Sequence, residues 1–75
     1  VIDIDRVRDL VIEILQSRDR IFMRELIDEV YSNGLDPFRV SEIIKDLMLN
    51  QRVTVANVQD NEGMFQLEIR PRDLQ

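Results

Sequence analysis

The chain has 75 residues, a formal net charge of −5, and neither cysteine nor histidine. This length fits one small domain, and the lack of thiols excludes a disulfide framework and a thiolate metal site. The charge is spread as −3 over residues 1–35 and −2 over the rest, so no basic stripe marks a phosphate-binding surface. No apolar run approaches the roughly 18 residues of a membrane span, and no signal-like segment opens the sequence. We therefore expect a soluble cytoplasmic domain without a membrane partner, associated with the nucleoid if its source is prokaryotic.

The first third of the chain carries an apolar stripe at helical spacing. Its members are Val7, Leu10, Val11, Ile14 and Leu15. This spacing predicts an amphipathic helix of about three turns that ends near Ser17. Asp3 or Asp5 is placed to cap it and to favour its positive N-terminal end. After a polar link, Ile21 is expected to form a short strand beside a later hairpin.

Two further stripes predict a helix-turn-helix in the middle of the chain. The second consists of Met23, Leu26, Ile27, Val30 and Tyr31, and the third of Val40, Ile43, Ile44, Leu47 and Met48. Asn33-Gly34 closes the second helix, because glycine adopts a left-handed C-cap without a Cβ clash. Asp36 as N-cap and Pro37 at the first helical position start the third helix, which Asn50 can end.

A β-hairpin is predicted after the third helix. Val53-Thr54-Val55 alternates in polarity, residues 60–63 (Asp-Asn-Glu-Gly) form a turn, and Phe65, Leu67 and Ile69 alternate again before Pro71. The turn lacks the later ligands of a calcium loop. Three helical stripes and one hairpin face must bury one another. We therefore predict one α+β winged-helix domain over residues 1–75, a three-helix helix-turn-helix core with a C-terminal hairpin wing.

The residues offer little for catalysis. Without histidine or cysteine, the usual general base near neutral pH and the usual soft nucleophile are missing. Acidic pairs such as Asp28-Glu29 belong to amphipathic helices, where charge runs are typically solvated. The only glycines are Gly34 and Gly63, so no phosphate-binding loop exists. We expect a domain without enzymatic activity, cofactor or metal.

The third helix and the wing are the candidate interaction surface. It comprises Arg39, Glu42, Lys45 and Asp46 on the helix and Gln59, Asp60, Asn61 and Glu62 on the wing. Arg39, Lys45 and Arg52 are possible weak DNA contacts, but the neighbouring acids repel the phosphate backbone. We expect weak or no direct DNA binding and favour protein docking, with mixed charges that give partner choice.

A sequence-specific DNA-binding transcriptional regulator is the alternative. A basic patch that brings Arg18, Arg20 and Arg52 together would favour DNA. An exposed apolar groove would favour a peptide or helix partner.

Four segments resemble the C-terminal winged helix of archaeal minichromosome maintenance replicative helicases. They are residues 21–30 (IFMRELIDEV), 34–36 (GLD), 40–47 (VSEIIKDL) and 50–53 (NQRV). Residues 2–5 (IDID) also resemble the segment that links the helicase motor to this tail. The strand entry Arg52-Val53-Thr54-Val55 departs from the usual Gly-x-Ile-Tyr type, and the wing is more polar. A similar arrangement occurs in the C-terminal, protein-docking domain of the middle subunit of eukaryotic replication protein A.

The resemblance implies an interaction or regulatory module of DNA replication. The chain starts at Val1 without methionine, which either methionine removal or excision from a longer protein would explain. Because a 75-residue acidic domain with no site of its own suits a module, we expect a domain excised from the C-terminus of a longer protein and monomeric in isolation. The implied partners are other replication proteins or other domains of the parent helicase, which would carry the ATPase and the DNA-translocating groups.

Overall fold

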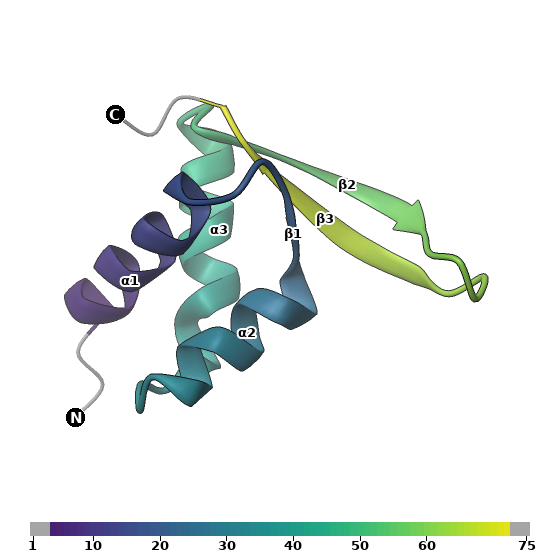
Figure 1. Cartoon of the computed structure of the whole chain (residues 1–75). Helices are drawn as coiled ribbons and strands as arrows, with labels where there is room; N and C mark the ends of the chain where they lie inside the picture. Colours follow the sequence, from purple (N-terminus) through teal and green to yellow (C-terminus); the bar gives the residue numbers. More distant parts are fainter. Residues whose placement is uncertain (1–3, 73–75) are drawn as a thin grey trace.

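The computed structural model describes residues 4–72, which form three α-helices, one short 3-10 helix and a three-stranded antiparallel sheet (Figure 1). In chain order the elements are α1 (Ile4–Gln16), β1 (Ile21–Phe22), α2 (Met23–Ser32), the 3-10 helix η1 (Pro37–Arg39), α3 (Val40–Leu49), β2 (Val53–Gln59) and β3 (Phe65–Pro71). The predicted α+β class and the predicted order of helices and strands are confirmed. The arrangement is compatible with a winged-helix-like fold.

The helix ends follow the predicted caps, except at the starts of α1 and α3. α1 begins at Ile4, so Asp5 lies inside its first turn and is not the N-cap, while Asp3 lies outside the described residues. Asp5 still carries negative charge at the positive end of the helix. The C-terminal end of α2 is as predicted. Asn33 is its C-cap, and Gly34 follows with a φ of 80°, the left-handed conformation expected.

The third helix begins more gradually than predicted. The side chain of Asp36 accepts a hydrogen bond from the Phe38 N–H at 2.8 Å, as an N-cap does, and Pro37 follows it. However, Pro37–Arg39 is a 3-10 turn, and the α-helix itself starts at Val40. The tighter i→i+3 bonding of a 3-10 turn commonly precedes a helix in this way. Asn50 ends α3 as predicted.

β3 is the central strand of the sheet, whose order is β1-β3-β2. Ile69 of β3 lies opposite Ile21 on one side and Val55 on the other, which confirms the short strand predicted at Ile21. β1 pairs with β3 at only two positions, whereas β2 pairs with it along all seven residues, from Val53 opposite Pro71 to Gln59 opposite Phe65. The sheet is therefore broad at its base and narrows to a two-stranded hairpin.

The core fills the space between the three helices and the base of the sheet. Its buried side chains are Val7, Val11, Ile14, Leu15, Ile21, Leu26, Val30, Val40, Ile43, Ile44, Leu47, Val53 and Ile69. Two predicted stripe members, Tyr31 and Met48, are exposed instead. Each follows a buried residue by one position, a rotation of about 100° that takes the side chain off the apolar stripe.

The prediction that Phe65, Leu67 and Ile69 share a buried face is wrong for two of them. The exposed fraction is 0% at Ile69, 44% at Leu67 and 66% at Phe65. The three side chains share one face of β3, because side chains two positions apart point the same way. The hairpin extends past the helices that cover its base (Figure 1), so the outer part of this face has no helix over it.

Candidate functional site

The tip of the hairpin is organised by the carboxylate of Asp60. Its Oδ1 accepts hydrogen bonds from the N–H groups of Glu62 and Met64, both at 2.9 Å, and its Oδ2 accepts one from Gln66 Nε2 at 2.6 Å. Gly63 has a φ of 84°, which glycine adopts without strain. The predicted turn is confirmed, and Asp60 is committed to holding it.

These hydrogen bonds also favour the ionised form of Asp60. The N–H of Met64, followed by the Gln66 amide, lowers the pKa of Asp60 below its ordinary value of 3.8, against a smaller opposing effect of desolvation. Donors that bind the ionised form of a carboxylate favour that form. The negative charge of the hairpin tip therefore persists to a lower pH than that of an ordinary aspartate.

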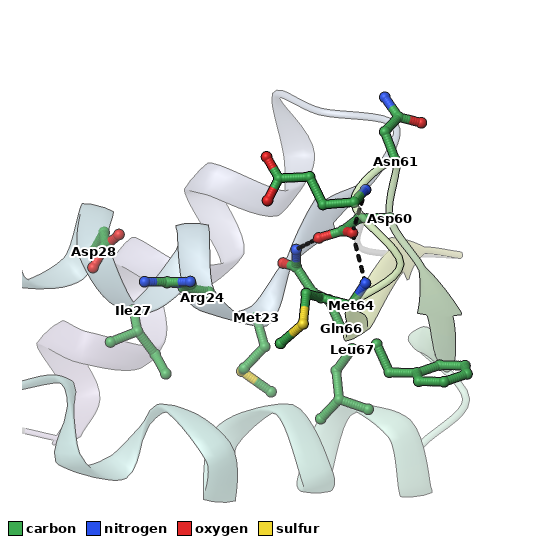
Figure 2. A pocket seen from close by; sticks show the side chains of 11 residues that line it. Met23, Arg24, Ile27, Asp28, Asp60, Asn61, Met64, Gln66 and Leu67 are labelled. Atoms are coloured by element: carbon green, nitrogen blue, oxygen red, sulfur yellow. Dashed lines mark hydrogen bonds between the residues drawn. The ribbon is translucent and has the colours of Figure 1, made fainter.

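A groove of about 750 Å³ lies between the tip-proximal half of the hairpin and α2 (Figure 2). Met23 and Ile27 line it from α2, and Met64, Phe65 and Leu67 line it from the hairpin. Figure 2 shows Ile27, Met23 and Leu67 following one another along it. Three of the five apolar side chains, those from the hairpin, are exposed. Contiguous apolar surface of this kind marks interaction sites in many proteins.

The rim of the groove is acidic. Its charged lining residues are three acids, Asp28 from α2 and Asp60 and Glu62 from the hairpin, and one basic residue, Arg24 of α2. Within residues 4–72, neither Asp28 nor Glu62 takes part in an ion pair. The groove thus has a net charge of −2 around an apolar interior, a combination that attracts cationic and apolar groups together.

The predicted contact residues near α3 are mostly engaged with opposite charges. Arg39 Nη1 lies 3.0 Å from Glu42 Oε2, and Arg8 Nη2 of α1 lies 3.3 Å from Asp46 Oδ2. Among the described residues, Lys45 is in no ion pair. This part of α3 therefore presents nearly balanced charge.

The structure divides the predicted interaction surface into two parts. Asp60, Asn61 and Glu62 line the groove with α2, while Gln59 supports the turn by donating from Nε2 to the Gly63 carbonyl at 3.0 Å. The four residues near α3 do not line this groove. Whether those residues contact a partner stays a prediction.

Sequence reasoning missed the apolar interior of the groove. The spacing predicts Met23, Ile27 and Leu67 as core residues. Met23 and Ile27 are half-buried and pack against the core while also lining the groove, whereas Leu67 is exposed. One signal was available, because Met64 and Phe65 are consecutive apolar residues where the turn meets the predicted strand, and a strand buries at most every second side chain on one face. At least one of them had to face away from any core beneath the hairpin.

The basic patch that would have favoured DNA is largely neutralised. Arg18 pairs with Glu29 and lies 3.7 Å from Glu25, and Arg20 Nη1 lies 3.5 Å from Glu68 Oε2. Phosphate binding would have to compete with these carboxylates. The two arginines therefore contribute less attraction for DNA than their sequence positions suggested.

Residues 4–72 contain no group of three or more His, Cys, Asp and Glu side chains arranged to hold a metal ion, and none of their helices is long and apolar enough to cross a membrane. A search finds no protein-family model that matches the chain, and no match among curated proteins or solved structures.

Proposed function

We propose that this chain is a winged-helix domain that docks a protein partner and performs no chemistry, as the C-terminal tail of a replicative helicase of the minichromosome maintenance kind. The order of helices and strands supports the winged-helix assignment, with β2 and β3 as the wing. The resemblance of residues 21–30 and 40–47 supports the helicase assignment. The partners are other domains of the parent helicase or other replication proteins.

The exposed apolar groove is the observation that carries the docking proposal. Met64, Phe65 and Leu67 expose apolar area to water. Burying such area contributes about 25 cal/mol of favourable free energy per Å². A partner that covers them recovers this free energy.

Charge argues against duplex DNA as the main partner. Helix-turn-helix proteins use the second helix of the motif to read the major groove, and the phosphates flanking it attract cations. Here Arg39 is paired with Glu42, and Asp46 adds a further acid beside Lys45. The wing tip carries Asp60 and Glu62. The domain therefore tunes the motor or docks a loader, while DNA is handled elsewhere in the parent protein.

Photo-crosslinking from the groove tests this proposal. A photoreactive phenylalanine analogue replaces Met64 in one variant and Phe38 in a matched control, since Phe38 is 73% exposed but does not line the groove. Both variants are irradiated in extract of the source cells, and adducts are identified by mass spectrometry. We expect a replication protein crosslinked at position 64 and not at position 38. Adducts with DNA from position 64, or the same proteins from both positions, would contradict the proposal.

A further inference from the structure

The strand β3 has an open edge beside the groove. β1 pairs with it only at Ile69 and Glu68, because the chain turns into α2 at Met23. From Leu67 back to Phe65, β3 therefore has no strand neighbour on the β1 side among residues 4–72. Unpaired strand edges are sites where another extended chain can add.

The hydrogen-bond pattern of the hairpin shows which backbone groups point to this open edge. Asp60 N–H donates to the Met64 carbonyl at 2.8 Å, and Arg72 N–H donates to the Arg52 carbonyl at 2.9 Å. Both bonds show that, along residues 64–72, the backbone N–H and C=O groups of the even-numbered residues point toward β2. Since an antiparallel strand directs its backbone groups to alternate sides, the odd-numbered Phe65 and Leu67 direct theirs to the open side.

We infer that an extended segment of a partner protein, with alternating apolar and Lys or Arg residues, adds as a strand along residues 65–67 in line with β1. The inference rests on the proposed docking function and specifies its partner. The backbone of the added strand bonds to Phe65 and Leu67, in the manner of β-strand addition. Its apolar side chains enter the groove beside Met23 and Ile27.

The charge of the rim selects a cationic partner. Asp28, Asp60 and Glu62 outnumber Arg24, and the whole chain has a net charge of −5. Lysine or arginine on the alternate positions of the added strand points to the face opposite the apolar side chains, where the field of these carboxylates still favours a cation. Such charge complementarity favours specificity and fast association. The same field repels nucleic acid phosphates and anionic lipid surfaces.

An extended segment suits this site better than a helix. A helix satisfies its own backbone, so a helix covering the groove would leave the N–H groups of Phe65 and Leu67 without partners and partly shielded from water. Leaving a donor desolvated and unbonded opposes binding. A strand supplies the missing acceptors and buries the apolar side chains in the same step.

Designed peptides test the inference on the 75-residue chain. The probe is a capped heptapeptide of alternating Lys and Val, compared with a Glu–Val heptapeptide and with an amphipathic Lys–Leu–Ala helix. Binding is followed by ¹⁵N NMR titration, and amide hydrogen exchange is measured at saturation. We expect the Lys–Val peptide alone to bind, and the exchange of the Phe65 amide to slow at least about tenfold because the amide becomes hydrogen-bonded.

Two phenylalanine variants provide the matched comparison. Phe65→Ala should weaken binding of the Lys–Val peptide about tenfold or more, since it removes an apolar anchor from the interface. Phe38→Ala removes a similarly exposed ring that does not line the groove and should change binding less than about twofold, within the effect of a non-contacting substitution. Circular dichroism of both variants is the check that separates loss of binding from loss of fold.

The possible failures are distinguishable. Binding of the Lys–Val peptide without slower exchange at Phe65, or tighter binding of the helical peptide, would overturn strand addition but leave protein docking in place. Equal binding of the Glu–Val peptide would overturn the cationic partner. A dimer in sedimentation that Phe65→Ala dissolves would make a second copy the occupant instead. If no peptide binds, the inference fails, and the crosslinking experiment still decides whether the domain docks a protein.

Discussion

Arg70 Nε lies 2.6 Å from Oε1 of Glu68, two positions along the same face of β3. The Glu68 side chain is only 7% exposed, and its other oxygen lies 3.5 Å from Arg20 Nη1, just before β1. The two guanidinium groups therefore shield a nearly buried carboxylate on the sheet face opposite Ile69. Arg20 also ties the start of the two-residue strand β1 to the central strand.

The first prediction is that removing the two arginines destabilises the domain more than neutralising the carboxylate that they bind. An Arg20→Ala, Arg70→Ala double variant leaves Glu68 buried without a counter-charge and should lose about 2 kcal/mol of stability, below the 3–5 kcal/mol of a fully buried pair because both arginines are largely exposed. Glu68→Gln leaves only solvated arginines and should cost about 1 kcal/mol or less. Urea denaturation measures both. Equal losses would mean that the carboxylate is not effectively desolvated.

The second prediction concerns the core. Leu47 of α3 is buried with Ile44 and Leu26, so Leu47→Ala should destabilise the domain by about 2–5 kcal/mol through lost transfer energy and a cavity. Met48→Ala, at the neighbouring exposed position, should cost less than about 1 kcal/mol. Thermal denaturation compares them. A Leu47→Ala protein that melts within a degree of the parent would refute the core assignment.

The third prediction concerns the backbone of the hairpin tip. A Cβ at Gly63 would meet Gln59 Nε2 at 3.6 Å, an ordinary contact, so space is available. The φ of 84° remains unfavourable for any L side chain, by about 1–2 kcal/mol. Gly63→Val should therefore destabilise by at least this much, while Glu62→Gln should have almost no effect. Similar large losses from both variants would show that Glu62 has a structural partner.

The fourth prediction is a pH dependence that arises at Asp60. Its pKa is lowered in the folded state, so the folded protein binds fewer protons than the unfolded chain as the pH falls below about 4. The stabilisation is complete above the ordinary pKa of 3.8 and is lost as the pH falls through the folded value. Asp60→Asn should flatten the acid limb of a plot of melting temperature against pH. An unchanged acid limb would mean that other carboxylates determine it.

Much of the fold was predictable because its signals are local. Asn33-Gly34 and Asp36-Pro37 specify their caps through the φ values and hydrogen bonds of neighbouring residues, and Gly63 does the same for the hairpin turn. Even the short strand at Ile21 followed from its place in the chain. The start of α3 differed by three residues because a 3-10 turn and a first helical turn share the same sequence preferences.

The candidate site depends on residues that are far apart in the sequence and come together only in the fold, which sequence spacing does not reveal. The groove is lined both by Asp28 of α2 and by Glu62 of the hairpin, which are far apart in the sequence. Whether Leu67 is buried depends on how far the hairpin extends past the helices, not on its alternation with Ile69. Likewise, Asp46 meets Arg8 across 38 positions of sequence, so the balance of charge on α3 emerges only when α1 packs against it.

The last prediction concerns nucleic acid. A protein that makes six or more phosphate contacts loses about a thousandfold or more in affinity between 50 and 200 mM salt, because each contact releases counterions. Arg39 is already paired with Glu42, and Lys45 is adjacent to Asp46, so the domain should bind a random duplex no tighter than about 10⁻⁴ to 10⁻⁶ M at physiological salt. Fluorescence anisotropy with labelled duplex and single-stranded DNA measures this. Nanomolar, sequence-dependent binding that an Arg39→Ala, Lys45→Ala double variant abolishes would replace the docking proposal with a DNA-binding regulator, whereas weak binding indifferent to both substitutions supports protein docking.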